Sequence, residues 1–191
     1  MKKDIIISGV GGQGIVSMAA IIGTAALESG LNLKQSEVHG MSQRGGDVLS
    51  NLRYSDKPIA SDLIPEGKAD MIISIEPLEA LRHLPRLSME GWIITNTNPY
   101  NNIENYPDIE GIISEVRKIP NHILVDADTI AKDLNARRST NVIILGAASE
   151  HLGFELAVLE NAIIKLFEKK GSKVIDQNIT AFYKGRELAH S

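Results

Sequence analysis

Short apolar segments alternate with helix-patterned segments along most of this chain. Asp4–Ser8 is a β-branched run that ends in a glycine, as is typical of a parallel strand buried on both faces. Small and apolar residues from Ile15 to Glu28 then predict a helix packed flat on a sheet, and Ser29 and Gly30 end it. The first thirty residues therefore predict a strand, a turn and a covering helix.

The same alternation continues further along the chain. Strands are predicted at Leu33–Val38, Val48–Tyr54, Ala69–Ile75, Gly91–Asn96 and Ile123–Asp126. The segment Val48–Tyr54 alternates in a way that suits an antiparallel strand. Helices are predicted at Pro77–Leu84 and Asp128–Leu134, and an exposed loop at Thr97–Asp108. After residue 140 the pattern is helical only, with segments Asn141–His151, Glu155–Lys169 and Asn178–Leu188 separated by Gly153 and Gly171.

The order of these elements predicts the fold class. Strands alternating with helices favour right-handed crossovers and a sheet covered on both faces. The βα units are too few for an eight-stranded barrel. We therefore predict an α/β fold with an open, doubly wound, mostly parallel, Rossmann-like sheet and a helical C-terminal section, in a single domain spanning residues 1–191.

Composition narrows the classes of function. Hydrophobic residues make up 43% of the chain and charged residues 23%, which is typical of a globular protein rather than a disordered one. A net charge of −4, with three Phe, four Tyr and one Trp, argues against nucleic acid as a partner. The first residues show no signal-peptide core and no window is apolar enough for a membrane span, so we expect a cytoplasmic location and no membrane partner. The absence of cysteine excludes disulfides, thiolate nucleophiles and thiolate-held iron–sulfur clusters.

A glycine-rich turn follows the first strand and opens the first helix. Its pattern Gly9-x-Gly11-x-x-Gly14 is typical of a dinucleotide-binding or phosphate-binding turn, where free amides at a helix N-terminus attract anions. The alternative is that these glycines only let the strand turn closely into the helix. A dinucleotide site would also need an acid at the end of the second strand, and Glu37 is close to that position. The candidate residues are Gly9, Gly11, Gly12, Gln13 and Gly14.

A second candidate segment is the polar loop 39–46 after the second strand. It places an imidazole, a hydroxyl, an amide and a guanidinium among glycines at the strand edge where open α/β sheets bind ligands. Arg44 offers a planar fork for a carboxylate or phosphate, and neighbouring glycines leave backbone amides accessible. The alternative is a solvated connection with incidental polar residues. The candidates here are His39, Ser42, Gln43, Arg44, Gly45 and Gly46.

The remaining polar residues give weaker signals. His39 suits acid–base chemistry, ligand binding or an interface, but the sequence offers no obvious orienting carboxylate nearby. The other histidines lack metal-ligand spacing, so no metal site is predicted and no catalytic residue is assigned. Acidic residues near strand ends cap helices as readily as they bind a ligand, and they receive no role: Glu76, Glu79, Asp126 and Asp128.

Taken together, the turn Gly9–Gly14 and the loop His39-Gly-Met-Ser-Gln-Arg-Gly-Gly46 resemble the γ-type domain of 2-oxoacid:ferredoxin oxidoreductases. Pyruvate and 2-oxoglutarate members tend to carry Ser-Tyr-Gly-Pro-x-x-Arg-Gly-Gly in this loop. The form here is similar to that of the β subunit of indolepyruvate:ferredoxin oxidoreductases, as is the continuation Asp47–Arg53. The resemblance covers essentially the whole chain.

The resemblance implies oxidative decarboxylation of an aryl 2-oxoacid by coenzyme A, with two electrons passed to ferredoxin. It also implies a large α subunit that carries thiamine diphosphate, Mg²⁺ and the iron–sulfur clusters, and no activity of this chain alone. The residues agree, because Gly46-Asp47 runs into Val48 and does not form the Gly-Asp-Gly segment expected of a thiamine site. Arg44 is expected to contact an anionic group at the partner's active centre.

Two alternatives stay open at this point. One is a free-standing Rossmann-like domain that binds a nucleotide through residues 9–14 and Glu37. The other is a non-catalytic assembly subunit of a related 2-oxoacid oxidoreductase, whose glycine loops serve only subunit packing. Co-purification with a large cysteine-rich protein separates the first alternative from the family expectation.

Overall fold

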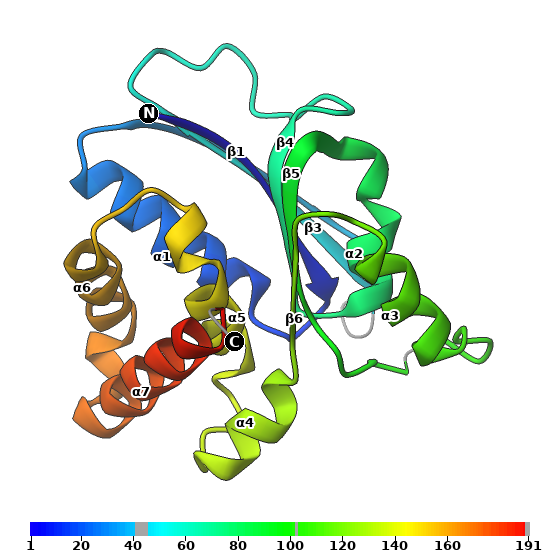
Figure 1. Ribbon diagram of the computed structural model, residues 1–191. Coiled ribbons are helices and arrows are strands. Elements are labelled where there is room, and N and C mark those ends of the chain that lie inside the picture. The colour runs from blue at the N-terminus through cyan, green and yellow to red at the C-terminus, as the bar shows by residue number, and fades with distance from the viewer. Residues whose placement is uncertain (41–45, 102, 190–191) are drawn as a thin grey trace.

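A single six-stranded sheet forms the centre of the structure (Figure 1). The computed structural model describes residues 1–40, 46–101 and 103–189. The strands lie in the order β2-β3-β1-β4-β5-β6. Their bounds are β1 Lys2–Val10, β2 Asn32–His39, β3 Asp47–Ser55, β4 Ala69–Ser74, β5 Leu87–Asn96 and β6 His122–Val125.

Strand direction places the carboxyl ends of the parallel strands at one edge. β1 pairs parallel with β4, β4 with β5, and β5 with β6. β3 is antiparallel to both of its neighbours, β1 and β2. The mostly parallel sheet is therefore confirmed, as is the antiparallel strand predicted at Val48–Tyr54.

Helices cover both faces of this sheet, which confirms the doubly wound arrangement. In Figure 1, α1, α5, α6 and α7 lie on one side and α2 and α3 on the other. The helices are α1 Ile15–Glu28, α2 Pro77–Arg82, α3 Ile109–Arg117, α4 Ala127–Asp133, α5 Thr140–Ala148, α6 Leu156–Phe167 and α7 Ser172–Leu188, with short 3₁₀ turns at 84–86, 149–151 and 168–170. None of the helices in the described ranges is long and apolar enough to cross a membrane.

One helix was not predicted from the sequence. α3 buries only Ile112, Ile113 and Val116 of its nine residues, so its apolar stripe is short. Asp108 begins it by accepting a hydrogen bond from the backbone N–H of Gly111 at 3.0 Å. The capping residue was a better signal for this helix than its hydrophobic pattern.

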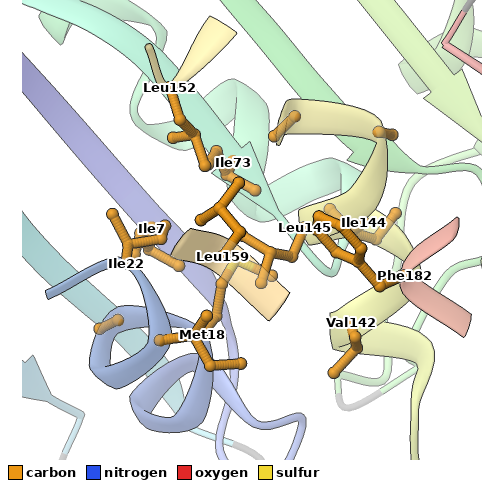
Figure 2. Packing of buried hydrophobic residues seen from close by; sticks show 14 of the residues in the cluster. Ile7, Met18, Ile22, Ile73, Val142, Ile144, Leu145, Leu152, Leu159 and Phe182 are labelled. Atoms are coloured by element: carbon orange, nitrogen blue, oxygen red, sulfur yellow. The ribbon is translucent and has the colours of Figure 1, made fainter. Parts of the chain in front are cut away.

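The core consists of two apolar layers, one on each face of the sheet. Ile5 and Ile7 of β1 face the larger layer, together with Met71 and Ile73 of β4, and Ile6 faces the smaller one. Figure 2 shows the larger layer, where side chains from α1, α5, α6 and α7 meet those of β1 and β4. This alternation explains the near-continuous apolar sequence of β1 and β4, because both strand faces are buried. All six strands share this core, and on that basis we propose that the chain forms one domain.

A buried ion pair ties β1 to β3 away from these layers. The Arg53 guanidinium donates to both carboxylate oxygens of Asp4, from Nε at 2.7 Å and from Nη2 at 3.0 Å. Its remaining nitrogen, Nη1, donates to the carbonyl oxygens of Ser61 and Leu63 and so fixes the loop after β3. Burial alone raises the pKa of Asp4, but hydrogen bonds from Arg53 and Lys2 outweigh it and hold this pKa below 3.8.

Asp4→Asn is expected to destabilise the fold by about 3 kcal/mol at pH 7, because it leaves the Arg53 guanidinium without its counter-charge. The folded pKa of Asp4 lies below its unfolded value, so this contribution is present above the unfolded value and is lost as the pH falls through the folded one. Urea unfolding at pH 7 and at about pH 3 should show that the gap in free energy of unfolding between wild type and variant is smaller in acid. Asp62→Asn, at an exposed carboxylate, is the matched control. A gap of constant size would mean that the ionised Asp4 does not stabilise the fold.

Candidate functional site

Hydrogen bonds between its own residues stabilise the glycine-rich turn between β1 and α1. The side chain of Gln13 accepts a hydrogen bond from the backbone N–H of Val10 at 2.7 Å, and the N–H of Gln13 donates to the Val10 carbonyl oxygen at 3.1 Å. Gly12 and Gly14 have φ values of 98° and 91°, in the left-handed region that glycine favours. A Cβ on Gly9 would lie 2.8 Å from Oε1 of Gln13. Part of this motif therefore forms the turn itself, in agreement with the alternative that these glycines let the strand turn closely into the helix.

The structure brings the two sequence motifs together. The N–H of Gly11 donates to the carbonyl oxygen of Gly46 at 2.8 Å. His39 and Gly40 line a pocket of about 660 Å³ with the glycine turn, Val16 and Val48. Of the candidates in the polar loop, Ser42, Gln43, Arg44 and Gly45 lie outside the described residues.

His39 has an acidic neighbour that the sequence reading did not recognise. Its Nε2 lies 3.3 Å from Oε2 of Glu37. Residues two apart on a strand share a face, so Glu37 could have been found from the strand period alone. The expectation that no orienting carboxylate is local was wrong. The His39 side chain is 57% exposed, which leaves it open to a ligand or a partner.

Glu37 does not occupy the position that a dinucleotide site needs. β3 lies between β1 and β2, so the strand that carries Glu37 is not a neighbour of the strand that leads into the glycine turn. In a Rossmann dinucleotide site the ribose-binding acid follows a strand adjacent to the first one. The sheet order therefore removes the arrangement on which the nucleotide-binding alternative depended.

A larger cleft of about 850 Å³ opens beside the glycine turn. Its wall includes Gly12, Gly14 and Ser17 from the start of α1, and Thr140 and Asn141 from the start of α5. Neither α1 nor α5 has a side-chain N-cap or an acidic residue in its first turn. Their first N–H groups and helix dipoles favour an anion at this end of the cleft.

Asn141 holds these two helix starts together. Its Nδ2 donates to the carbonyl oxygen of Gly14 at 3.1 Å. A Cβ on Gly14 would lie 2.6 Å from the same nitrogen, so a side chain there would push α5 away from α1. Glycine is therefore favoured at position 14 for two reasons: its backbone is left-handed, and the two helices approach each other closely there.

Cationic side chains complete the lining of this cleft. Arg137 and Arg138 are exposed, and neither forms an ion pair with any residue in the part of the chain that the structure describes. Lys170 also lines the cleft, with its Nζ 5.3 Å from the centre of the Phe167 ring. The wall includes one carboxylate, Asp128, which accepts a hydrogen bond from the hydroxyl of Thr140 at 3.2 Å. The cleft thus combines two helix N-termini with three cations, a chemistry that suits a phosphorylated ligand.

Two buried carboxyl groups follow β4 at the same edge of the sheet. Glu76 caps α2, because its Oε2 accepts a hydrogen bond from the N–H of Glu79 at 2.8 Å. Burial raises the pKa of Glu79 to about 7, although the Arg82 guanidinium opposes the shift. Oε2 of Glu79 has no hydrogen-bond partner within the described ranges, and partial protonation at neutral pH lowers the cost of burying it there.

Comparison with known proteins identifies the family. Residues 4–188 match the family described as pyruvate ferredoxin/flavodoxin oxidoreductase. This chain belongs to that family. It is 37% identical to the indolepyruvate oxidoreductase subunit IorB of Methanothermobacter thermautotrophicus, over 97% of this chain and 96% of that protein. It is also 37% identical to the subunit of the same name from Pyrococcus horikoshii, over 99% of this chain and 97% of that protein.

A solved structure agrees with the fold of this family member. The 2-oxoglutarate:ferredoxin oxidoreductase of Magnetococcus marinus superposes with a TM-score of 0.78, and its structure contains 2-oxoglutarate, coenzyme A and succinyl-CoA. The identity is 23%, and the match covers 99% of this chain and 31% of that longer one. The fold expected from the resemblance is therefore confirmed.

Most of the cationic cleft in this family member was not predicted from the sequence. Arg137 and Arg138 lie just before Ser139, the N-cap residue of α5, and the helix was predicted to begin at Asn141. Two adjacent arginines just before a helix that lacks an acidic first turn were the available signal. Their approach to the glycine turn, more than 120 residues earlier, depends on the packing of α5 beside α1 and could not be read from spacing.

Proposed function

We propose that this chain is the small subunit of an indolepyruvate:ferredoxin oxidoreductase. The complex would convert an aryl 2-oxoacid and coenzyme A into an acyl-CoA, CO₂ and a proton, and pass two electrons to ferredoxin. The observation that carries the proposal is the similarity over nearly the full length of both chains to proteins named as indolepyruvate oxidoreductase subunits. The loop His39–Gly46 supports the aryl branch of the family.

The proposal divides the chemistry between two subunits. This chain has no cysteine, so thiolate-held iron–sulfur clusters need another chain. The residues that the structure describes contain no group of three potential metal ligands, and the sequence lacks a Gly-Asp-Gly thiamine segment. We assign thiamine diphosphate, Mg²⁺ and the clusters to a large α subunit, and we propose a cytoplasmic complex that binds neither membrane nor nucleic acid.

This chain would contribute the binding of coenzyme A. The cationic cleft offers Arg137, Arg138, Lys170 and two helix N-termini, and coenzyme A carries several phosphate groups. The coenzyme thiol would then have to reach the active centre of the partner, so the partner should dock near the glycine turn. We propose that Arg44, in the loop joined to this turn through Gly11 and Gly46, meets an anionic group at that junction.

Reconstitution tests the proposal. The chain should be co-expressed with a candidate large subunit from the same organism, and the purified complex assayed for viologen reduction with indolepyruvate and coenzyme A. We expect reduction that needs both substrates and both subunits, with the small subunit alone as the control. Activity with pyruvate and none with aryl 2-oxoacids would assign the chain to another branch, and activity that is independent of this chain would favour an assembly role.

A further inference from the structure

An aromatic side chain stands in the wall of the cationic cleft. Tyr100 lies in the loop between β5 and α3 and lines the cleft with 45% of its surface exposed. Phe167 also lines the cleft, but it is only 7% exposed and packs into the core. Tyr100 therefore has ring surface available to a ligand that enters from solvent.

A buried carboxylate fixes the backbone that carries this ring. Glu76 is 1% exposed, and its Oε1 accepts hydrogen bonds from the backbone N–H of Tyr100 at 3.4 Å and from the hydroxyl of Tyr106. Its Oε2 is already engaged by the cap of α2. Burial and the hydrogen bond to Glu76 also raise the pKa of the Tyr106 hydroxyl, so it remains a donor at working pH. One carboxylate thus joins the end of β4 to two positions of the loop.

Coenzyme A has chemistry that matches both parts of this cleft. Its phosphates suit the arginines and helix N-termini, and its adenine offers a flat π-face. Bases stack readily on aromatic side chains, and such stacking does not depend on hydrogen-bond readout. We propose that the Tyr100 ring stacks on the adenine of coenzyme A, and that Glu76 and Tyr106 act as positioning residues for that ring. The inference rests on the proposed function, since it deepens the assignment of coenzyme A to this cleft.

Three variants of the assembled complex test the stacking contact. Tyr100→Ala removes the ring, Tyr100→Phe keeps the ring and removes the hydroxyl, and Tyr183→Ala truncates an exposed tyrosine of α7 outside the cleft lining. The KM for coenzyme A should rise about 5- to 150-fold in Tyr100→Ala, the range expected for one lost base stack. It should change less than about twofold in Tyr100→Phe and in the control. Equilibrium binding of coenzyme A without 2-oxoacid should follow the same order.

A shortened thiol substrate tests whether the rise in KM for Tyr100→Ala depends on the adenosine part of coenzyme A. Phosphopantetheine keeps the thiol arm and lacks adenosine, so wild type and Tyr100→Ala should use it equally well. Tyr106→Phe tests the positioning role without disturbing the cap of α2, and should raise the KM for coenzyme A with kcat unchanged. A merely structural role for Tyr106 would instead lower the melting temperature and affect both thiol substrates alike.

The outcomes separate this inference from the proposed function. Equal KM values for coenzyme A in wild type and Tyr100→Ala would overturn the stacking contact, as would an equal loss with phosphopantetheine. A raised KM for the 2-oxoacid with an unchanged KM for coenzyme A would place the ring against the aryl substrate, and would also overturn it. Failure of the proposed function looks different, because the wild-type complex itself would then show no coenzyme A-dependent dye reduction.

Discussion

Gly185→Ala is expected to destabilise the isolated chain severely, by at least about 3 kcal/mol, the upper end of the usual cost of overpacking. A Cβ at this position in α7 would lie 1.9 Å from the carbonyl oxygen of Ile143 in α5. The reverse contact is just as close, since a Cβ on Gly146 of α5 would lie 2.0 Å from the carbonyl oxygen of Phe182. Both obstacles are backbone atoms, so no rotation of a side chain relieves the clash, and the two helices must separate.

Other helical glycines supply a graded control for this prediction. A Cβ on Gly23 of α1 would lie 3.1 Å from a methyl carbon of Leu33. This contact is tight, but the flexible Leu33 side chain can move to relieve it. A Cβ on Gly111 of α3 would make an ordinary contact with Asp108 at 3.7 Å, and alanine favours the helix more than glycine. Urea unfolding and thermal melting should therefore show much lower stability for Gly185→Ala and Gly146→Ala than for Gly23→Ala. Gly111→Ala should be neutral or slightly stabilising. Equal stability across the series would mean that α5 and α7 are not in backbone contact.

This helix contact shows what the local sequence pattern could and could not predict. α1 begins and ends at the predicted residues, because a strand, a glycine turn and a small-residue helix follow one another without a gap. The strands were predicted within a few residues, and the clearest signal came from β1 and β4, whose apolar runs are buried on both faces of the sheet. The pairing of α5 with α7 depends on two glycines almost forty residues apart, which the sequence shows only as isolated breaks in helical segments.

The candidate site also has one part that local motifs predicted and another that depends on tertiary packing. The glycine turn and the beginning of the polar loop were found from local motifs, and the hydrogen bond from Gly11 to Gly46 joins them. Glu76 was left without a role because a carboxylate after a strand is usually a cap; it does cap α2, and it also holds the loop of Tyr100. The cationic cleft required knowing which helix starts beside α1, a consequence of tertiary packing.

The cleft itself gives the second large expected effect. The double variant Arg137→Gln/Arg138→Gln should raise the KM of the assembled complex for coenzyme A on the order of 100-fold, because each of the two charge-assisted hydrogen bonds to phosphate contributes about 1.5 kcal/mol. Stability should stay close to wild type, since both arginines are exposed and neither forms an ion pair with the residues that the structure describes. The KM for the 2-oxoacid and the kcat at saturating coenzyme A should change little.

Salt and a truncated ligand show whether the lost interaction is with phosphate. Binding of coenzyme A to the wild-type complex should weaken as ionic strength rises, because added salt screens exposed charges, and the double variant should respond less steeply. If the arginines contact the 3′-phosphate, the variant should lose more affinity for coenzyme A than for 3′-dephospho-coenzyme A. Arg117→Gln removes an exposed positive charge from α3 on the opposite face of the sheet and is the matched control (Figure 1). An unchanged KM for coenzyme A in the double variant, with wild-type salt dependence, would move the phosphate-binding site away from this cleft.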